Sequence, residues 1–145
     1  MRVDRSIVID ADRDVVWKIV NDPDRYPSFM TRLERWESAN DQPLGIGARY
    51  FVHWKIGSVP VGGLMEVVEF DDLRDLAWVG ITGVTLRGRI RLREAANGTK
   101  VTFRLSYQSP GGLWGYIADR VAVGQVGRIA ADTLKRLKLL AQLGG

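Results

Sequence analysis

The sequence predicts an α+β fold in which a curved antiparallel sheet of seven strands wraps around one long C-terminal helix. Apolar and polar residues alternate along seven segments, which is typical of half-buried strands. Short turns rich in Gly, Pro, Asn and Asp separate the last six segments, and antiparallel neighbours are favoured because parallel strands need long crossovers. A proline-free stretch from Leu113 to about Leu143 follows, enough for a helix of roughly 45 Å.

The N-terminal part of the chain predicts one strand and two short helices. The strand runs from about Val3 to Asp10, and Asp10 or Asp12 can cap the first helix. Asp22 and Pro23 are typical of a helix N-terminus and begin the second helix. The first helix has apolar residues at helical spacing, namely Val15, Val16, Trp17, Ile19 and Val20.

Strands six and seven show the clearest alternation. One face of the sixth strand carries Leu86, Gly88, Ile90 and Leu92. Its other face carries Arg87, Arg89, Arg91 and Arg93. The apolar face of the seventh strand carries Val101, Phe103, Leu105 and Tyr107. One face of the sheet is therefore expected to meet water, and the other is expected to be covered by the terminal helix. The helix stripe expected to provide this cover comprises Leu113, Ile117, Val121, Gly124, Ala131, Leu134, Leu137 and Ala141.

Composition bounds the class of protein. At 145 residues, with 46% hydrophobic and 26% charged residues, the chain is expected to be one globular domain spanning residues 1–145. The absence of cysteine excludes disulfides, thiolate metal ligands and cysteine nucleophiles. The sequence offers neither an apolar signal region nor a long apolar run, and we expect a cytoplasmic protein.

Several segments, together with the order of elements, resemble the helix-grip superfamily, also called SRPBCC or START-like. The first matches are Ser6-Ile7-Val8-Ile9-Asp10-Ala11 ahead of Val15-Val16-Trp17, and then Asn21-Asp22-Pro23-Asp24-Arg25-Tyr26-Pro27. Later matches are Val67-Val68-Glu69-Phe70-Asp71 ahead of Leu76-Ala77-Trp78, Asn97-Gly98-Thr99-Lys100-Val101-Thr102-Phe103, and Thr133-Leu134-Lys135-Arg136-Leu137-Lys138. The loop motif of the plant allergen branch is missing, and the chain is shorter than sterol-carrying START domains. It is therefore most similar to the bacterial polyketide cyclase/dehydrase-like members.

The resemblance implies a cavity between sheet and helix, where members hold sterols, lipids, quinones, hormones or polyketides, and only some members are enzymes. Strand alternation and the helix stripe place a set of candidate ligand-binding residues inward: Tyr50, Trp54, Trp78, Gly88, Tyr107, Ile117, Val121 and Gly124. The short helices are expected to close one mouth with Trp17, Phe29 and Met30. Arg120 could meet a ligand carboxylate or phosphate, or form a surface ion pair with Asp119. The alternative is a solid core in which the rings interlock.

Candidate chemistry is sparse. Glu66 is a weak candidate for proton transfer if it points inward, and a solvated strand residue if it points outward. His53, the single histidine, is expected to face outward, and Ser58 is not in a nucleophile elbow. Zinc sites need ligands that the chain lacks, so neither a metal nor a cofactor is expected. Gly45-Ile46-Gly47 precedes a strand, which excludes a dinucleotide fingerprint.

The row Arg87, Arg89, Arg91 and Arg93 forms a basic stripe. Such a stripe could make a weak contact with an anionic membrane, or be a merely solvated face. Nucleic acid is disfavoured because no exposed aromatic residues are interleaved to stack bases. The expected function is binding of a hydrophobic small molecule such as a lipid, a quinone or a polyketide-like metabolite. The alternatives are a polyketide cyclase, aromatase or dehydratase, and an interaction module that uses the basic face. Ligand identity and oligomeric state stay open at this point.

Overall fold

The computed structural model describes residues 2–56, 59–82, 85–108 and 113–144. For residues 59, 85, 107–108 and 113–123 it describes the backbone alone. The strands are β1 (Arg2–Ile9), β2 (Leu33–Ser38), β3 (Arg49–Ile56), β4 (Val59–Asp71), β5 (Asp75–Gly80), β6 (Thr85–Ala95) and β7 (Gly98–Gln108). The helices are α1 (Arg13–Val20), the 3-10 turn η1 (Pro23–Arg25), α2 (Tyr26–Phe29) and α3 (Leu113–Gln142).

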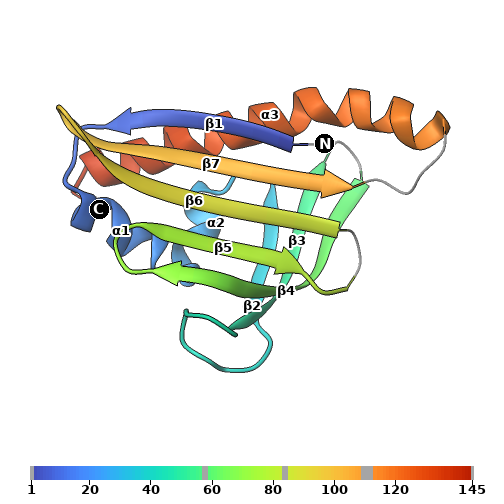
Figure 1. The fold of residues 1–145 in the computed structure, drawn as a ribbon, viewed down its shortest axis with the longest axis horizontal. Helices are drawn as coiled ribbons and strands as arrows, with labels where there is room; N and C mark the ends of the chain where they lie inside the picture. The colour runs from blue at the N-terminus through green and yellow to red at the C-terminus, as the bar shows by residue number, and fades with distance from the viewer. Residues whose placement is uncertain (1, 57–58, 83–84, 109–112, 145) are drawn as a thin grey trace.

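The seven strands form one antiparallel sheet in the order β1-β7-β6-β5-β4-β3-β2. The helix α3 packs mainly against β1, and Figure 1 shows its N-terminal turns extending past the end of that strand. The helices α1 and α2 lie between β1 and β2 in the chain, as the sequence predicted. The predicted α+β helix-grip fold is therefore confirmed.

Local sequence explains how the short helices begin. Asp12 occupies the N-cap position of α1, but its side chain makes no capping hydrogen bond. Asp22 does cap η1, because its Oδ1 accepts a hydrogen bond of 3.2 Å from the backbone N–H of Asp24. Pro23 stands at the first position of that turn, where a missing N–H costs nothing. The helical segment is then tied to the sheet by the packing of Tyr26.

The strand β4 contains a glycine pair, Gly62–Gly63, in a backbone conformation that other residues rarely adopt. Gly63 has a φ of +142°, and a β-carbon there would lie 2.3 Å from the carbonyl oxygen of Thr82. A second irregularity is a register shift between Val67 and Glu69. Both features let β4 bend between its two neighbours, since glycine tolerates this backbone and a bulge increases twist.

An aromatic cluster fills the middle of the interior. The ring of Trp36 on β2 lies 4.8 Å from Tyr26, 5.5 Å from Tyr50, 5.8 Å from Trp54 and 5.4 Å from Trp78, centroid to centroid. Most of these pairs are edge to face, which aromatic rings favour. At the centre of the fold the rings therefore form a solid core, which was the alternative to a large cavity there.

The buried face of α3 differs from the predicted stripe. Gly124 was expected to face inward, but it is exposed, and a β-carbon there would meet no atom within 4 Å. Ala131 is half-buried. The stripe is rotated because about 100° of helical turn per residue puts Gly124 far from Val126, which is buried. Among the residues of α3 whose burial is described, those buried are Val126, Gly127, Ile129, Ala130, Thr133, Leu134, Leu137 and Ala141.

In the described part of the chain, no helix is both long and apolar enough to cross a membrane.

Candidate functional site

A small cavity lies between the sheet and α3, at the end of the interior where β6 begins and β7 ends. Its volume is about 20 Å³. Among the described residues, the lining is apolar and comes from four strands and the helix: Trp54, Ile56, Val61, Leu86, Leu105, Val126 and Ile129. A water molecule could fit the volume but would find no hydrogen-bond partner among these side chains. The described lining therefore carries no polar group that would hold a water molecule in place.

The strand register brings lining residues from neighbouring strands together on the inner face. On β3 and β4, Trp54 pairs with Val61, so both side chains stand on the inner face. Between β4 and β6, the strand β5 ends at Gly80, one position beyond the Val79–Arg87 pair. A glycine has no side chain to extend inward, and no residue of β5 is among the described residues that line the cavity. The cavity is thus bordered by β3 and β4 on one side and by β6 and β7 on the other.

Trp54 is the sequence-predicted residue that lines this cavity among those whose side chains are described. Tyr50 and Trp78 belong to the aromatic cluster instead. Gly88 leaves no gap, because a β-carbon there would lie 2.4 Å from the indole Cε2 of Trp78. The expected opening beside that glycine is therefore already filled by a ring.

The short helices do not border this cavity. Trp17 packs against Phe70, with ring centroids 5.7 Å apart. Phe70 precedes the β4–β5 turn, so Trp17 closes the end of the interior away from the cavity, where Figure 1 shows α1. Phe29 and Met30 are almost completely buried in the core. These three residues therefore stabilise the fold rather than frame the described cavity.

Four further predicted residues lie where the structure describes the backbone alone. Tyr107 is in β7, and Ile117, Arg120 and Val121 are in the N-terminal half of α3. Their side chains lie outside the described residues, as does that of Asp119, so their roles stay predictions.

Sequence reasoning missed most of the lining. Leu86 and Leu105 were assigned to the apolar faces of their strands but not to a site. Val126 and Ile129 were absent from the predicted helix stripe. A usable signal for Val126 exists in the spacing 126, 130, 133, 137 and 141, which follows one face of a helix. The lining became identifiable once the register of strands and helix was known.

Glu66 faces outward. Its neighbours Met65 and Val67 are buried, and its Oε1 accepts a hydrogen bond of 2.9 Å from Nε of Arg49 on β3. The ion pair sits on the outer face of the sheet, away from the apolar cavity. This position offers no support for proton transfer by Glu66 inside the cavity.

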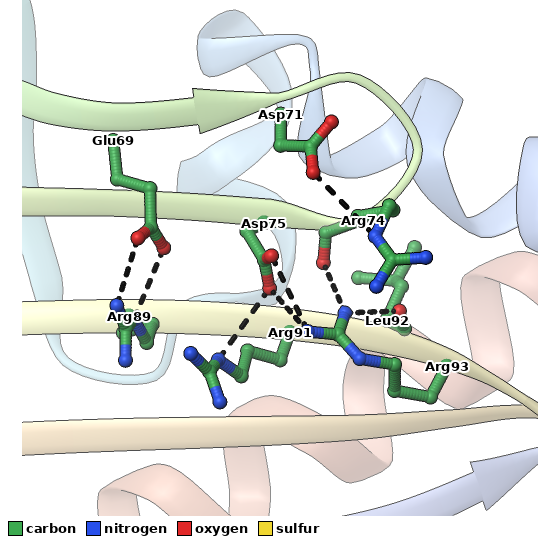
Figure 2. Close-up of polar contacts among 8 residues, drawn as sticks. All are labelled: Glu69, Asp71, Arg74, Asp75, Arg89, Arg91, Leu92 and Arg93. Atoms are coloured by element: carbon green, nitrogen blue, oxygen red, sulfur yellow. Dashed lines mark hydrogen bonds and ion pairs between the residues drawn. The ribbon is translucent and has the colours of Figure 1, made fainter.

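The arginine row on β6 lies on the outer face and is partly neutralised, as Figure 2 shows. Glu69 accepts two hydrogen bonds from Arg89, at 3.1 and 2.8 Å. Asp75 forms ion pairs with Arg91 at 3.5 Å and Arg93 at 3.1 Å, and its side chain is only 12% exposed.

The same outer face carries a further ion pair. Nε of Arg104 donates a 2.7 Å hydrogen bond to Asp4, and this bond lowers the pKa of the Asp4 carboxyl below its usual value. Arg87 forms no ion pair with any described residue. The outer face therefore carries both positive and negative charges. Contact with an anionic membrane stays a prediction, and fewer unpaired arginines are available for it because Arg89, Arg91 and Arg93 form ion pairs.

Several solved structures share this fold. The protein TTHA0849 from Thermus thermophilus is 18% identical with a TM-score of 0.84, and the match covers 99% of this chain and 98% of that one. DR_A0006 from Deinococcus radiodurans is 21% identical with a TM-score of 0.71, and each chain is covered completely. The Zhui aromatase/cyclase from Streptomyces sp. R1128 is 16% identical with a TM-score of 0.78, covering 98% of this chain and 93% of that one. No curated protein is significantly similar in sequence.

A family model described as polyketide cyclase / dehydrase and lipid transport matches residues 1–142. The match spans β1 through α3 and includes every residue that lines the cavity. The chain therefore belongs to the polyketide cyclase / dehydrase and lipid transport family.

Proposed function

We propose that this protein binds an apolar small molecule between the sheet and α3, at the end of the interior that holds the cavity. The observation that carries the proposal is an unfilled space lined by apolar side chains from both sheet and helix. Protein interiors are close-packed and contain few voids larger than a water molecule. The family description, which includes lipid transport, points to the same class of ligand.

A binding role is favoured over catalysis by the chemistry of the lining. Among the residues whose side chains the structure describes, the lining contains no acid, base or nucleophile. A cyclase or dehydratase that moves protons with its own side chains would need such groups within hydrogen-bond distance of the substrate. The one carboxylate considered from the sequence, Glu66, is engaged by Arg49 on the other face of the sheet.

The ligand must enlarge the cavity as it binds. The present volume of about 20 Å³ is far below the several hundred Å³ that drug-sized ligands occupy. Val126 and Ile129 are the α3 side chains in the lining, so a shift of this part of the helix away from β3 and β7 would widen the space. Opening exposes apolar surface, and the ligand compensates by covering it.

The experiment is a fluorescence titration with the neutral probe N-phenyl-1-naphthylamine. Val126→Phe is expected to weaken binding about tenfold or more, because the added ring occupies the cavity, and tenfold corresponds to about 1.4 kcal/mol. Leu139→Phe is the matched control on the same helix, since Leu139 is 61% exposed. Circular dichroism and thermal unfolding confirm that both variants fold.

Two further measurements complete the test. Val126→Ala enlarges the space and is expected to retain or strengthen binding of the probe. Native mass spectrometry of the freshly purified protein is expected to detect a co-purifying apolar compound, whose identity then names the ligand class. The proposal is wrong if the wild-type protein and Val126→Phe bind the probe equally.

A further inference from the structure

A second hollow lies on the other side of Ile129. It is a cleft of about 360 Å³ between the α2–β2 connection, the end of β3 and α3. Ile129 lines both the apolar cavity and this cleft, so the two spaces share one lining residue. Lys55 in the cleft precedes Ile56 in the cavity lining. The two spaces are therefore adjacent.

The chemistry of the cleft is opposite to that of the cavity. Three cations, Arg32, Lys55 and Arg128, and one carboxylate, Asp132, line it. Three positive charges and one negative charge leave an excess of two positive charges.

None of these cations forms an ion pair with a described residue. Asp132 lies four residues after Arg128 on α3, yet the two side chains stay beyond ion-pair distance. Elsewhere in the same structure arginines pair with carboxylates, as Arg89 does with Glu69. Like charges gathered without a partner repel one another, and an anion placed among them is favoured.

The backbone that carries Arg32 is held in a costly conformation. Arg32 has a φ of +67°, in the left-handed region that non-glycine residues rarely adopt. Two hydrogen bonds fix it there: the N–H of Lys55 donates to the carbonyl of Arg32 at 2.9 Å, and the N–H of Thr31 donates to Oγ1 of Thr133 at 3.0 Å. These bonds hold the α2–β2 connection against β3, which carries Lys55, and against α3, which carries Arg128.

A polar group in the same connection lacks a partner. The hydroxyl oxygen of Thr31 is buried and makes no hydrogen bond with a described residue, although Thr31 lines the cleft. This oxygen has almost no exposed surface, so a ligand oxygen in the cleft would reach it only after a shift of the α2–β2 connection. Strained residues and unsatisfied buried polar groups are both common at binding sites.

We infer that the ligand is an amphipathic anion. Its apolar body occupies the cavity, and its acidic group, a carboxylate, sulfonate or phosphate, binds Arg32, Lys55 and Arg128 in the adjacent cleft. Guanidinium and ammonium groups form charge-assisted hydrogen bonds with such oxygens. The inference rests on the proposed function and adds the charge and polarity of the ligand.

Two fluorescent probes with the same ring skeleton separate the two ideas. N-Phenyl-1-naphthylamine is neutral, and 1-anilinonaphthalene-8-sulfonate adds one anionic group. The wild-type protein is expected to bind the sulfonate more tightly. The triple variant Arg32→Asn, Lys55→Gln, Arg128→Gln is expected to lose at least about tenfold in affinity for the sulfonate and less than about twofold for the neutral probe. Asn is chosen because it tolerates a positive φ.

Control variants test for general charge effects. Arg87→Gln removes an unpaired arginine from the outer face and is expected to leave both affinities unchanged. The single variants Lys55→Gln and Arg128→Gln, which leave Arg32 in place, are expected to give intermediate losses. Added salt is expected to weaken the sulfonate complex alone, because it screens exposed charges.

Displacement of the bound sulfonate probe identifies the acidic group. Dodecanoate and dodecyl phosphate are expected to compete better than dodecanol, and whichever of the two is stronger names the preferred head group. Equal affinity for both probes, unchanged in the triple variant, would overturn the inference and leave the proposed function standing. Binding of neither probe would overturn both.

Discussion

The indole of Trp78 on β5 covers Gly88 on β6 so closely that a β-carbon on Gly88 would lie 2.4 Å from its Cε2 atom. The two residues are direct partners across the strands. The glycine is needed because the ring occupies the place of a side chain. A small residue next to a large one thus completes the aromatic cluster rather than leaving an opening.

Replacing this glycine tests that relationship. Gly88→Ala is expected to lower the free energy of unfolding by about 1–3 kcal/mol, because the added methyl group must displace a buried ring. Urea denaturation measures the change. Gly124→Ala on the exposed face of α3 is the control, and it is expected to raise stability by roughly 0.5–1 kcal/mol, since alanine favours helix. If Gly88→Ala leaves the free energy of unfolding unchanged, the ring of Trp78 can move aside without cost.

The carboxylate of Asp75 holds two arginines on the outer face of the sheet (Figure 2). Asp75→Ala is expected to lower the free energy of unfolding by about 1.5–3 kcal/mol, the range for a hydrogen bond to a charged group. Asp71→Ala is the matched control, because the Asp71–Arg74 pair is exposed and such pairs are worth less than about 1 kcal/mol. Thermal and urea unfolding should show a larger loss of stability for Asp75→Ala than for Asp71→Ala. Equal losses in the two variants would contradict the prediction.

Trp36 joins four other aromatic rings and is expected to be the largest single contributor to the core. Trp36→Ala should lower the free energy of unfolding by about 3–5 kcal/mol. Trp36→Phe should cost well under half as much, because it keeps a ring and removes an indole N–H that has no partner among the described residues. Phe51→Ala, on the outer face, is the control with an expected cost below about 1 kcal/mol. Denaturant unfolding followed by circular dichroism distinguishes the three.

Tyr26 gives a prediction for alkaline pH. Burial raises the pKa of its phenol well above the usual value of 10.0, and the hydroxyl donates a 2.6 Å hydrogen bond to the carbonyl of Val20. A group whose pKa is higher in the folded state contributes full stability below its unfolded pKa, and this stability is lost as pH rises above that value. Unfolding should therefore become easier above about pH 10.

Tyr26→Phe tests this dependence. The variant should lose about 1–3 kcal/mol at about pH 8, because the carbonyl of Val20 loses its partner. The difference from the wild-type protein should shrink at about pH 11, where ionisation of Tyr26 already favours the unfolded wild-type chain. Urea denaturation at the two pH values measures it. A constant difference at both values would show that Tyr26 ionises normally in the folded protein.

Local pattern determined much of the fold. Alternation in β6 and β7 assigned the faces of Leu86 and Arg87 correctly, because side chains in a strand alternate strictly. The absence of proline after Leu113 predicted α3 with an accurate start. The resemblance in Asn21 to Pro27 and in the later segments indicated the family that the family model then confirmed.

The site could not be obtained in the same way. Apolar residues around Glu66 occupy both odd and even positions of β4, so alternation alone does not identify the buried face. Whether Glu66 points inward or outward therefore depended on the strand register. The face of α3 that meets the sheet was misjudged at Gly124, because the stripe is apolar but irregular. Val126 and Ile129 are the helix residues in the described lining, so a small error in the predicted rotation of α3 assigns the wrong residues to the cavity.

The sequence by itself determined the order and type of the elements, the covered face of the sheet and the family to which the chain belongs. Only the tertiary structure decided where space remains and which charges meet beside it. Arg32, Lys55 and Arg128 are far apart in the chain and share a cleft because the α2–β2 connection is hydrogen-bonded to β3 and α3. Such convergence depends on long-range packing, and no local pattern in a sequence encodes it directly.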